Sequence, residues 1–222
     1  MAVAVASASA ADLSDRVTSQ VAEEEELLRA QLYLLLSRLL AAAPDARLLG
    51  ELKGTGGDSS ELGKAFVALA REAASTSAAD AKSEYHDLFI GIGRGELVPY
   101  GSYYLTGFLH EKPLAELREA LAGLGIVRDG SVKEPEDHIA ALCEVMAGLI
   151  NGAFDVAAPL LAQRRFFERH IAPWAARFFA DLEGAETARF YRAVGQVGRL
   201  FVGIETTAFA MVHGDEFDGR VT

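Results

Sequence analysis

Apolar residues recur at steps of three or four along most of this chain, and that spacing limits its fold more than any other feature. The clearest run follows Pro135, where the apolar residues are Ile139, Leu142, Cys143, Met146, Leu149 and Ile150. Residues with this spacing share one face of a helix. No segment shows the sustained period-two alternation of a half-buried strand, and no hairpin dipeptide joins two β-branched runs. We therefore predict an all-α protein that folds as a single-domain helical bundle.

Capping residues, prolines and glycines divide the pattern into separate helices. Thr18 or Ser19 can cap the first helix, which should run to about Ala43, because the four glutamates at 23–26 suit the positive end of a helix dipole and Pro44 ends the pattern. The other helices are expected over 61–74, from 78 to the glycine run at 91, over 113–122, after Pro135, after Asp155 and from about 185. Pro173 should kink or break the helix that follows Asp155.

The chain length sets the expected domain organisation. A chain of 222 residues, half of them apolar, can bury one sizeable core. We expect one helical domain over residues 19–212, a disordered amino-terminal tail at 1–18 and a carboxy-terminal tail at 213–222. Within the domain, residues 97–104 mix a proline and a glycine with aromatic side chains, which predicts irregular backbone.

A formal net charge of −11 restricts the partners of the chain. Such a field repels phosphate backbones, so we expect no nucleic-acid partner, and the glutamate run at 23–26 argues against a helical transcription regulator. The same field attracts basic peptides. The longest apolar run, at 27–43, carries Arg29 and Arg38, so we expect no stable membrane insertion. The lone Cys143 cannot form an internal disulfide, which fits a cytoplasmic protein.

No motif for catalysis stands out among the polar residues. The five histidines show no paired spacing of metal ligands, and a serine or cysteine elbow is absent. The run of Gly91, Gly93 and Gly95 departs from G-x-G-x-x-G spacing and follows no predicted strand, so we interpret it as a connector. We therefore predict no catalytic residue, no metal, no cofactor and no enzymatic activity. The alternative is a helical metal-dependent hydrolase, whose ligands would have to come from distant helices.

One short string, Glu-Pro-Glu-Asp-His at residues 134–138, allows two interpretations. Acidic residues after a proline commonly start helices, so their spacing alone favours a structural role. Together with Tyr-His-Asp-Leu-Phe at 85–89 and Pro-Tyr-Gly-Ser-Tyr-Tyr-Leu at 99–105, the string resembles the TorD/DmsD/NarJ family of redox-enzyme maturation chaperones. The order and spacing of the three strings are most similar to DmsD-like members, and the resemblance covers roughly residues 25–205.

The resemblance implies a helical bundle of the TorD-like type that acts as a chaperone in the cytoplasm. Its implied partners are the twin-arginine signal peptide and the apoenzyme of an exported molybdopterin-containing oxidoreductase, whose export it would delay until the cofactor is inserted. The client would be a formate dehydrogenase or a reductase of the DMSO or TMAO type. The chaperone would be a monomer or a homodimer.

The resemblance also implies the residues of a signal-peptide-binding site, which are Glu134, Asp137, His138, Tyr100, Ser102 and Tyr104. An arginine pair followed by an apolar stretch requires carboxylates beside an apolar groove, and Asp137 and Glu134 are expected to supply them. A charged hydrogen bond of this kind contributes about 1.5 to 3 kcal/mol, and its fork geometry disfavours lysine. His138 is expected to act as a neutral acceptor, an orienter of Asp137 or a stacking surface. Tyr100, Tyr103 and Tyr104 would either wall the apolar part or pack in the core, and similar family members can carry tryptophan where Tyr100 and Tyr104 stand.

Overall fold

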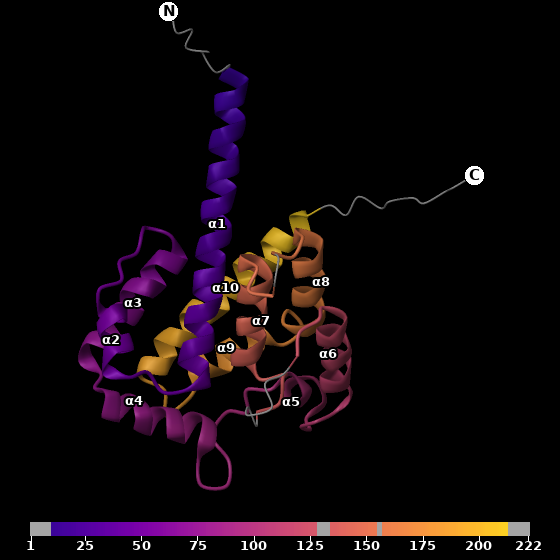
Figure 1. Cartoon of the computed structure of the whole chain (residues 1–222). Helices are drawn as coiled ribbons and strands as arrows, with labels where there is room; N and C mark the ends of the chain where they lie inside the picture. The colour runs from indigo at the N-terminus through magenta and orange to yellow at the C-terminus, as the bar shows by residue number, and fades with distance from the viewer. Residues whose placement is uncertain (1–9, 128–133, 155–156, 213–222) are drawn as a thin grey trace, which may run out of the picture.

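The computed structural model describes residues 10–127, 134–154 and 157–212, with side chains from residue 23 onward. Every regular element within these residues is a helix (Figure 1), which confirms the predicted all-α fold. The elements are α1 (Ala10–Ala41), α2 (Ala46–Lys53), α3 (Glu61–Ser75), α4 (Ala78–Tyr85), the π-helical turn η1 (His86–Ile90), α5 (Gly101–Thr106), α6 (Lys112–Gly123), α7 (Ile139–Asn151), α8 (Leu160–His170), α9 (Ala175–Gly184) and α10 (Phe190–Met211). None of the described helices has both the length and the apolar character needed to cross a bilayer.

Two long helices, α1 and α10, organise the body of the protein. α1 packs along α7, while α10 packs along α9 and α3. The core between them is rich in aromatic rings, and its largest fully buried side chains include Trp174, Tyr33, Tyr191, Phe167, Phe178 and Phe179. Each such ring contributes about 1.5 to 3 kcal/mol by leaving water. Figure 1 shows that the amino-terminal part of α1 extends beyond the other helices, whereas α5 and α6 lie together at one side.

The first helix begins earlier than predicted but ends close to the predicted residue. α1 begins at Ala10 instead of near Ser19 and ends at Ala41, close to the predicted end. Alanine is the strongest helix former, so the alanine-rich sequence near residue 10 is compatible with helix although we predicted a tail there. Residues 1–9 and 213–222 of the two predicted tails lie outside the described residues.

Two short helices lie where none was predicted. Asp45 caps the start of α2, because its Oδ1 accepts a hydrogen bond from the Leu48 amide at 2.8 Å, and the helix buries Leu48, Leu49 and Leu52. α5 begins within the segment 97–104 that was predicted as irregular backbone, so that prediction was wrong for residues 101–104, whereas residues 97–100 lie outside any helix as predicted. The first turn of α5 is stabilised by the Asp137 carboxylate, which lies far along the chain and gives no local signal. The predicted break at Pro173 is confirmed, because α8 ends at His170 and α9 begins at Ala175.

Carboxylates from distant segments also set where α10 begins. Glu84 accepts hydrogen bonds from the amides of Arg189 and Tyr191, both at 2.7 Å. Glu96 accepts from the Glu186 amide at 2.6 Å. These contacts hold the residues before Phe190 as a turn, so α10 starts there and not at about 185 as the sequence predicted.

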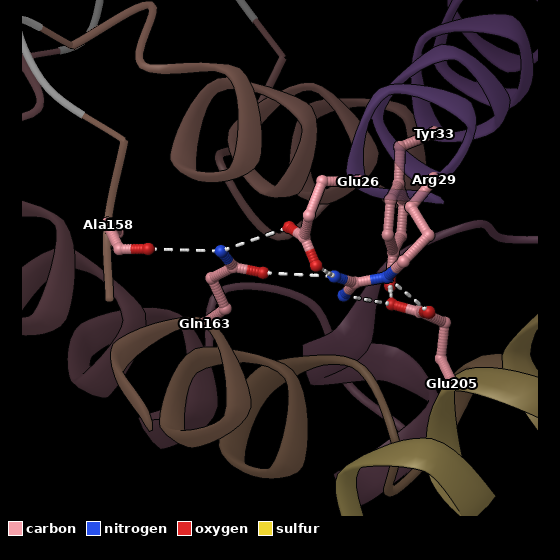
Figure 2. Close-up of polar contacts among 6 residues, drawn as sticks. All are labelled: Glu26, Arg29, Tyr33, Ala158, Gln163 and Glu205. Atoms are coloured by element: carbon pink, nitrogen blue, oxygen red, sulfur yellow. Dashed lines mark hydrogen bonds and ion pairs between the residues drawn. The ribbon is translucent and has the colours of Figure 1, made fainter. Parts of the chain in front are cut away.

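A polar cluster joins α1, α8 and α10 within the apolar body (Figure 2). We call it the Arg29 cluster; it consists of Glu26, Arg29, Tyr33, Gln163 and Glu205. The Arg29 guanidinium forks onto Glu205 with two hydrogen bonds of 2.8 Å and also donates to Glu26 and Gln163. The Tyr33 hydroxyl donates to Glu205 at 3.0 Å. Glu205 is only 1% exposed. A buried carboxylate needs a cation and hydrogen-bond donors, and Arg29 and Tyr33 provide them here.

Candidate peptide-binding site

The start of α7 lies directly against the segment that leads into α5. The Ile139 amide donates to the Pro99 carbonyl at 2.9 Å, and the Gly101 amide donates to the Asp137 carbonyl at 2.9 Å. Between these bonds, Tyr100 and His138 form the isolated antiparallel bridge. Two of the three sequence strings behind the predicted site therefore form one continuous structural unit.

The buried side chain of Asp137 links the start of α7 to the first turn of α5. Its side chain is only 3% exposed, and its Oδ2 accepts a hydrogen bond from the Ser102 amide at 2.7 Å. A carboxylate in this position satisfies an unpaired amide and complements the positive end of α5. Within the described part of the chain, Asp137 Oδ1 and Ser102 Oγ are both buried without a hydrogen-bond partner. Asp137 thus positions the backbone around Tyr100 and does not line the groove described below.

His138 caps α7 and is electrically neutral. Its Nδ1 accepts a hydrogen bond from the Ala140 amide at 3.1 Å. Burial, which outweighs the nearby carboxylates Glu134 and Asp137, lowers the pKa of His138 to about 4. The edge of its ring meets the Tyr100 ring, with centroids 5.0 Å apart and planes at 78°. Because Nδ1 accepts, Nε2 carries the proton of the neutral ring, so at neutral pH this imidazole adds a donor and a ring surface without adding positive charge.

Tyr100 fixes the position of the first exposed carboxylate. Its hydroxyl donates a hydrogen bond to Glu134 Oε2. Burial, with this hydrogen bond and the Glu134 charge, raises the pKa of Tyr100 well above its ordinary value, so the phenol remains a donor. The hydrogen bond restrains an exposed glutamate that would otherwise sample many rotamers.

Tyr100, Glu134 and His138 line one groove of about 770 Å³, which we call the tyrosine groove. Its other walls come from the end of α1, from α4 and η1, and from α7. A second groove of about 700 Å³, the α6 groove, runs between α6 and α7 and is lined mainly by Leu121, Ala122, Ile126, Val127, Val145 and Phe154. Glu134, Ala141 and Glu144 line both grooves, so they form the edge between them.

Glu144 is the residue of this site that the sequence analysis missed. Its side chain is exposed on α7 and, among the described residues, it has no hydrogen bond or ion pair. The signal that could have revealed it is the helical spacing of Ala141, Glu144 and Val145, which places the glutamate beside two partly buried residues on one side of α7. A carboxylate beside partly buried residues at that spacing fits the wall of a groove better than a fully solvated helix face.

The remaining predicted residues lie apart from both grooves. Ser102 is fully buried on α5 beneath the tyrosine groove. The Tyr104 hydroxyl donates to Asp181 at 3.0 Å, and its ring lies 5.4 Å from that of Trp174. Tyr104 lines a separate hollow of about 410 Å³ together with Arg94. The structure therefore brings together Tyr100, Glu134 and His138, with Asp137 and Ser102 beneath them and Tyr104 elsewhere.

The glycine run forms a connector between η1 and the segment before α5, as predicted, and its backbone turns tightly at Gly91. Gly91 has φ +59°, and a Cβ there would lie 2.1 Å from the Arg94 carbonyl oxygen, so another residue would be strained. Among the residues that the structure describes, no group of three or more His, Cys, Asp or Glu side chains could hold a metal ion. Burial raises the pKa of Cys143 to about 12, which keeps this thiol protonated.

Comparison with known proteins finds chaperones among the relatives of this chain. The chain resembles the chaperone protein TorD of Vibrio atlanticus, with 26% identity over 136 residues, which is 58% of this chain and 63% of the relative. It thus spans about three fifths of the length of that relative. TorD of Shewanella loihica is 25% identical over 203 residues, 81% of this chain and 92% of the relative.

A solved structure shares the fold. A crystal structure from Archaeoglobus fulgidus, provisionally described as a redox enzyme maturation protein, aligns with a TM-score of 0.53 at 21% identity over 79% of this chain and 93% of its own. The family model described as nitrate reductase delta subunit matches residues 56–180, which is more than half of this chain and includes all three motif strings. These findings confirm the family resemblance, while the closer likeness to DmsD-like members stays a prediction. The chain belongs to the nitrate reductase delta subunit family, which includes the TorD and NarJ proteins.

Proposed function

We propose that this protein is a cytoplasmic chaperone that binds the twin-arginine signal peptide and the apoenzyme of an exported molybdopterin-containing oxidoreductase. Membership in a family with TorD chaperones supports the general role. The observation that carries the proposal is the edge between the two grooves, where Glu134 and Glu144 have no cationic partner among the described residues. Covering the arginine pair would withhold the client from export until its cofactor is inserted.

The chemistry of this edge suits guanidinium groups. An arginine presents a planar fork of donors that matches a carboxylate, whereas lysine presents a compact point charge. Tyr100 holds Glu134 in place through its hydroxyl. His138 lies beside them and stays neutral, so it does not repel a cation. The net charge of −11 adds long-range attraction for a basic peptide.

Some of the predicted residues would contact the peptide directly, whereas others would position those that do. Glu134, together with Glu144, would bind the arginine pair directly, and Tyr100 and His138 would contact it from the tyrosine groove. Asp137 would act through the backbone of Tyr100 and Ser102, because its carboxylate is buried and already accepts a hydrogen bond. The client remains a formate dehydrogenase or a DMSO- or TMAO-type reductase, since neither groove distinguishes these classes.

Calorimetric titration with synthetic peptides tests the proposal. A peptide with an arginine pair followed by an apolar stretch should bind the full chain, bind less tightly as salt rises, and lose at least tenfold in affinity when both arginines become lysines. The double variant Glu134→Gln/Glu144→Gln should lose a similar factor. The control double variant Glu23→Gln/Glu119→Gln removes the same charge from exposed positions outside both grooves and should bind within about twofold. Failure of the wild type to bind any such peptide would overturn the proposal.

A further inference from the structure

The two grooves differ in how their polar groups are distributed. Polar residues of the tyrosine groove come from several walls, with Lys82 and His86 on one side and Tyr100 and His138 on another. In the α6 groove the charged lining residues are Arg118 on α6, Glu134 and Glu136 before α7 and Glu144 near the middle of α7, and the other described lining residues are apolar or glycine. Arg118 donates two hydrogen bonds to Glu136, at 3.0 and 2.9 Å, so the positive charge that lines this groove already has a carboxylate partner.

Beyond these charges the α6 groove is apolar along the rest of its length. Val145 forms part of its floor on α7, while Leu121 and Ala122 form the α6 wall. Phe154, which follows α7 in the chain, also lines the groove, and its ring lies against Gly148 of α7. A Cβ at Gly148 would meet that ring at 2.3 Å, so only glycine allows this contact.

The order of these features follows the α7 axis. Glu134 precedes the helix, Glu144 lies near its middle, and Phe154 comes after its end. From Ala141 to Gly148 the axis advances about 10 Å at 1.5 Å per residue, which is the reach of about three extended residues. A volume of about 700 Å³ is within the range of sites that enclose a ligand.

We propose that the α6 groove holds the apolar stretch that follows the arginine pair of the client peptide. The arginines lie at the Glu134–Glu144 edge, and the chain then runs along α7 toward Phe154. The inference rests on the proposed function and adds to it the direction of the peptide and the groove that receives its apolar part. Charged residues followed by apolar ones along one axis match an arginine pair followed by an apolar segment. The mixed polar walls of the tyrosine groove do not.

A pair of alanine variants tests which groove is used. Ala122 lines the α6 groove and Ala42 lines the tyrosine groove, and both are exposed. Ala122→Glu and Ala42→Glu add the same charge, so any general change in attraction for the arginines is shared. Ala115→Glu, on the same face of α6 two turns earlier and outside both grooves, is the control for folding. Thermal unfolding of all three variants should match the wild type within a few degrees.

Titration uses the arginine-pair peptide and a second peptide in which serines replace its apolar stretch. We expect Ala122→Glu to weaken binding of the first peptide at least fivefold and to change binding of the serine peptide by less than twofold. Ala42→Glu and Ala115→Glu should change neither by more than twofold. Weakening by Ala42→Glu instead, by both groove variants or by neither would overturn the assignment of the α6 groove while leaving the proposed function intact. If wild-type protein binds neither peptide, both proposals fail together.

Discussion

Two regions of this protein place glutamates beside apolar surface, and they differ in where the matching cation comes from. In the Arg29 cluster, Glu205 is buried and receives a bidentate fork from the protein's own arginine (Figure 2). At the edge between the grooves, Glu134 and Glu144 are exposed, and neither pairs with a cation among the described residues. The first arrangement completes the fold. The second leaves room for a guanidinium from outside, so we expect loss of charge to reduce stability in one region and recognition in the other.

Removal of the internal arginine should produce the largest effect on stability. Arg29→Met leaves Glu26 and Glu205 without their cation, and an uncompensated buried charge costs about 3 to 5 kcal/mol of the free energy of unfolding. Urea denaturation measures this loss. The matched variant Arg47→Met removes an exposed arginine that pairs with Glu51 on α2 and should cost less than about 1 kcal/mol.

Peptide binding by the folded fraction of Arg29→Met should stay within about twofold of the wild type, because the Arg29 cluster lines neither groove. A loss of less than about 1 kcal/mol in stability, or a tenfold loss of peptide affinity with the fold intact, would contradict the division between the two regions.

Asp137 combines features of the two regions, because it belongs to the Glu-Pro-Glu-Asp-His string and yet is buried like Glu205. Asp137→Ala removes the acceptor for the Ser102 amide and should cost about 1 kcal/mol of stability, with a several-fold loss of peptide affinity as Tyr100 shifts. Asp137→Asn keeps an acceptor oxygen, so it should restore affinity to within about twofold. Paired unfolding and titration measurements separate the outcomes. An asparagine variant that binds as poorly as the alanine variant would show that the peptide senses the charge of Asp137 directly.

The smallest effect concerns pH. Because the pKa of His138 is lowered to about 4, about one molecule in a hundred carries the imidazolium at pH 6. Affinity for the arginine-pair peptide should therefore change by less than twofold between pH 8 and pH 6. A fivefold loss on acidification would mean that His138 gains charge in this range and repels the peptide.

Stability should respond to pH with a definite sign. The folded pKa of His138 lies below the ordinary value, so the unfolded chain takes up this proton first as the solution is acidified. The contribution to the free energy of unfolding is present above about pH 6.5 and declines as the pH falls toward 4. His170, whose pKa burial also lowers to about 4, acts in the same direction.

The sequence predicted those parts of the fold that depend on local pattern. The apolar stripe after Pro135 predicted the buried face of α7, and Pro173 predicted the break between α8 and α9. It missed α5 and misplaced the start of α10, because Asp137 and Glu84 stabilise those helix starts from distant positions. Such pairings follow from the tertiary fold and leave no periodic signal in the chain.

The candidate site was predicted in outline but not in its roles. The motif strings identified Tyr100, Glu134 and His138, which do share a groove. They also suggested Asp137 as a carboxylate that binds the arginine pair in the groove, but it is 3% exposed and lines neither groove, so we propose that it acts as a positioning residue. Glu144 belongs to no motif string, and whether a helical glutamate faces solvent or lines a groove depends on what packs on either side. The Arg29 cluster was hidden for the same reason, since Arg29 and Glu205 lie at opposite ends of the chain.

A double-mutant cycle between protein and peptide tests the central claim most directly. Glu134→Gln and Glu144→Gln are each combined with a peptide in which one arginine is replaced by glutamine, and all affinities are measured by calorimetry at one salt concentration. If these carboxylates receive the arginine pair, at least one combination should show a coupling energy of about 1 kcal/mol or more. Effects that add within about 0.3 to 0.5 kcal/mol for every combination would contradict the account, because the glutamates would then not contact the arginines.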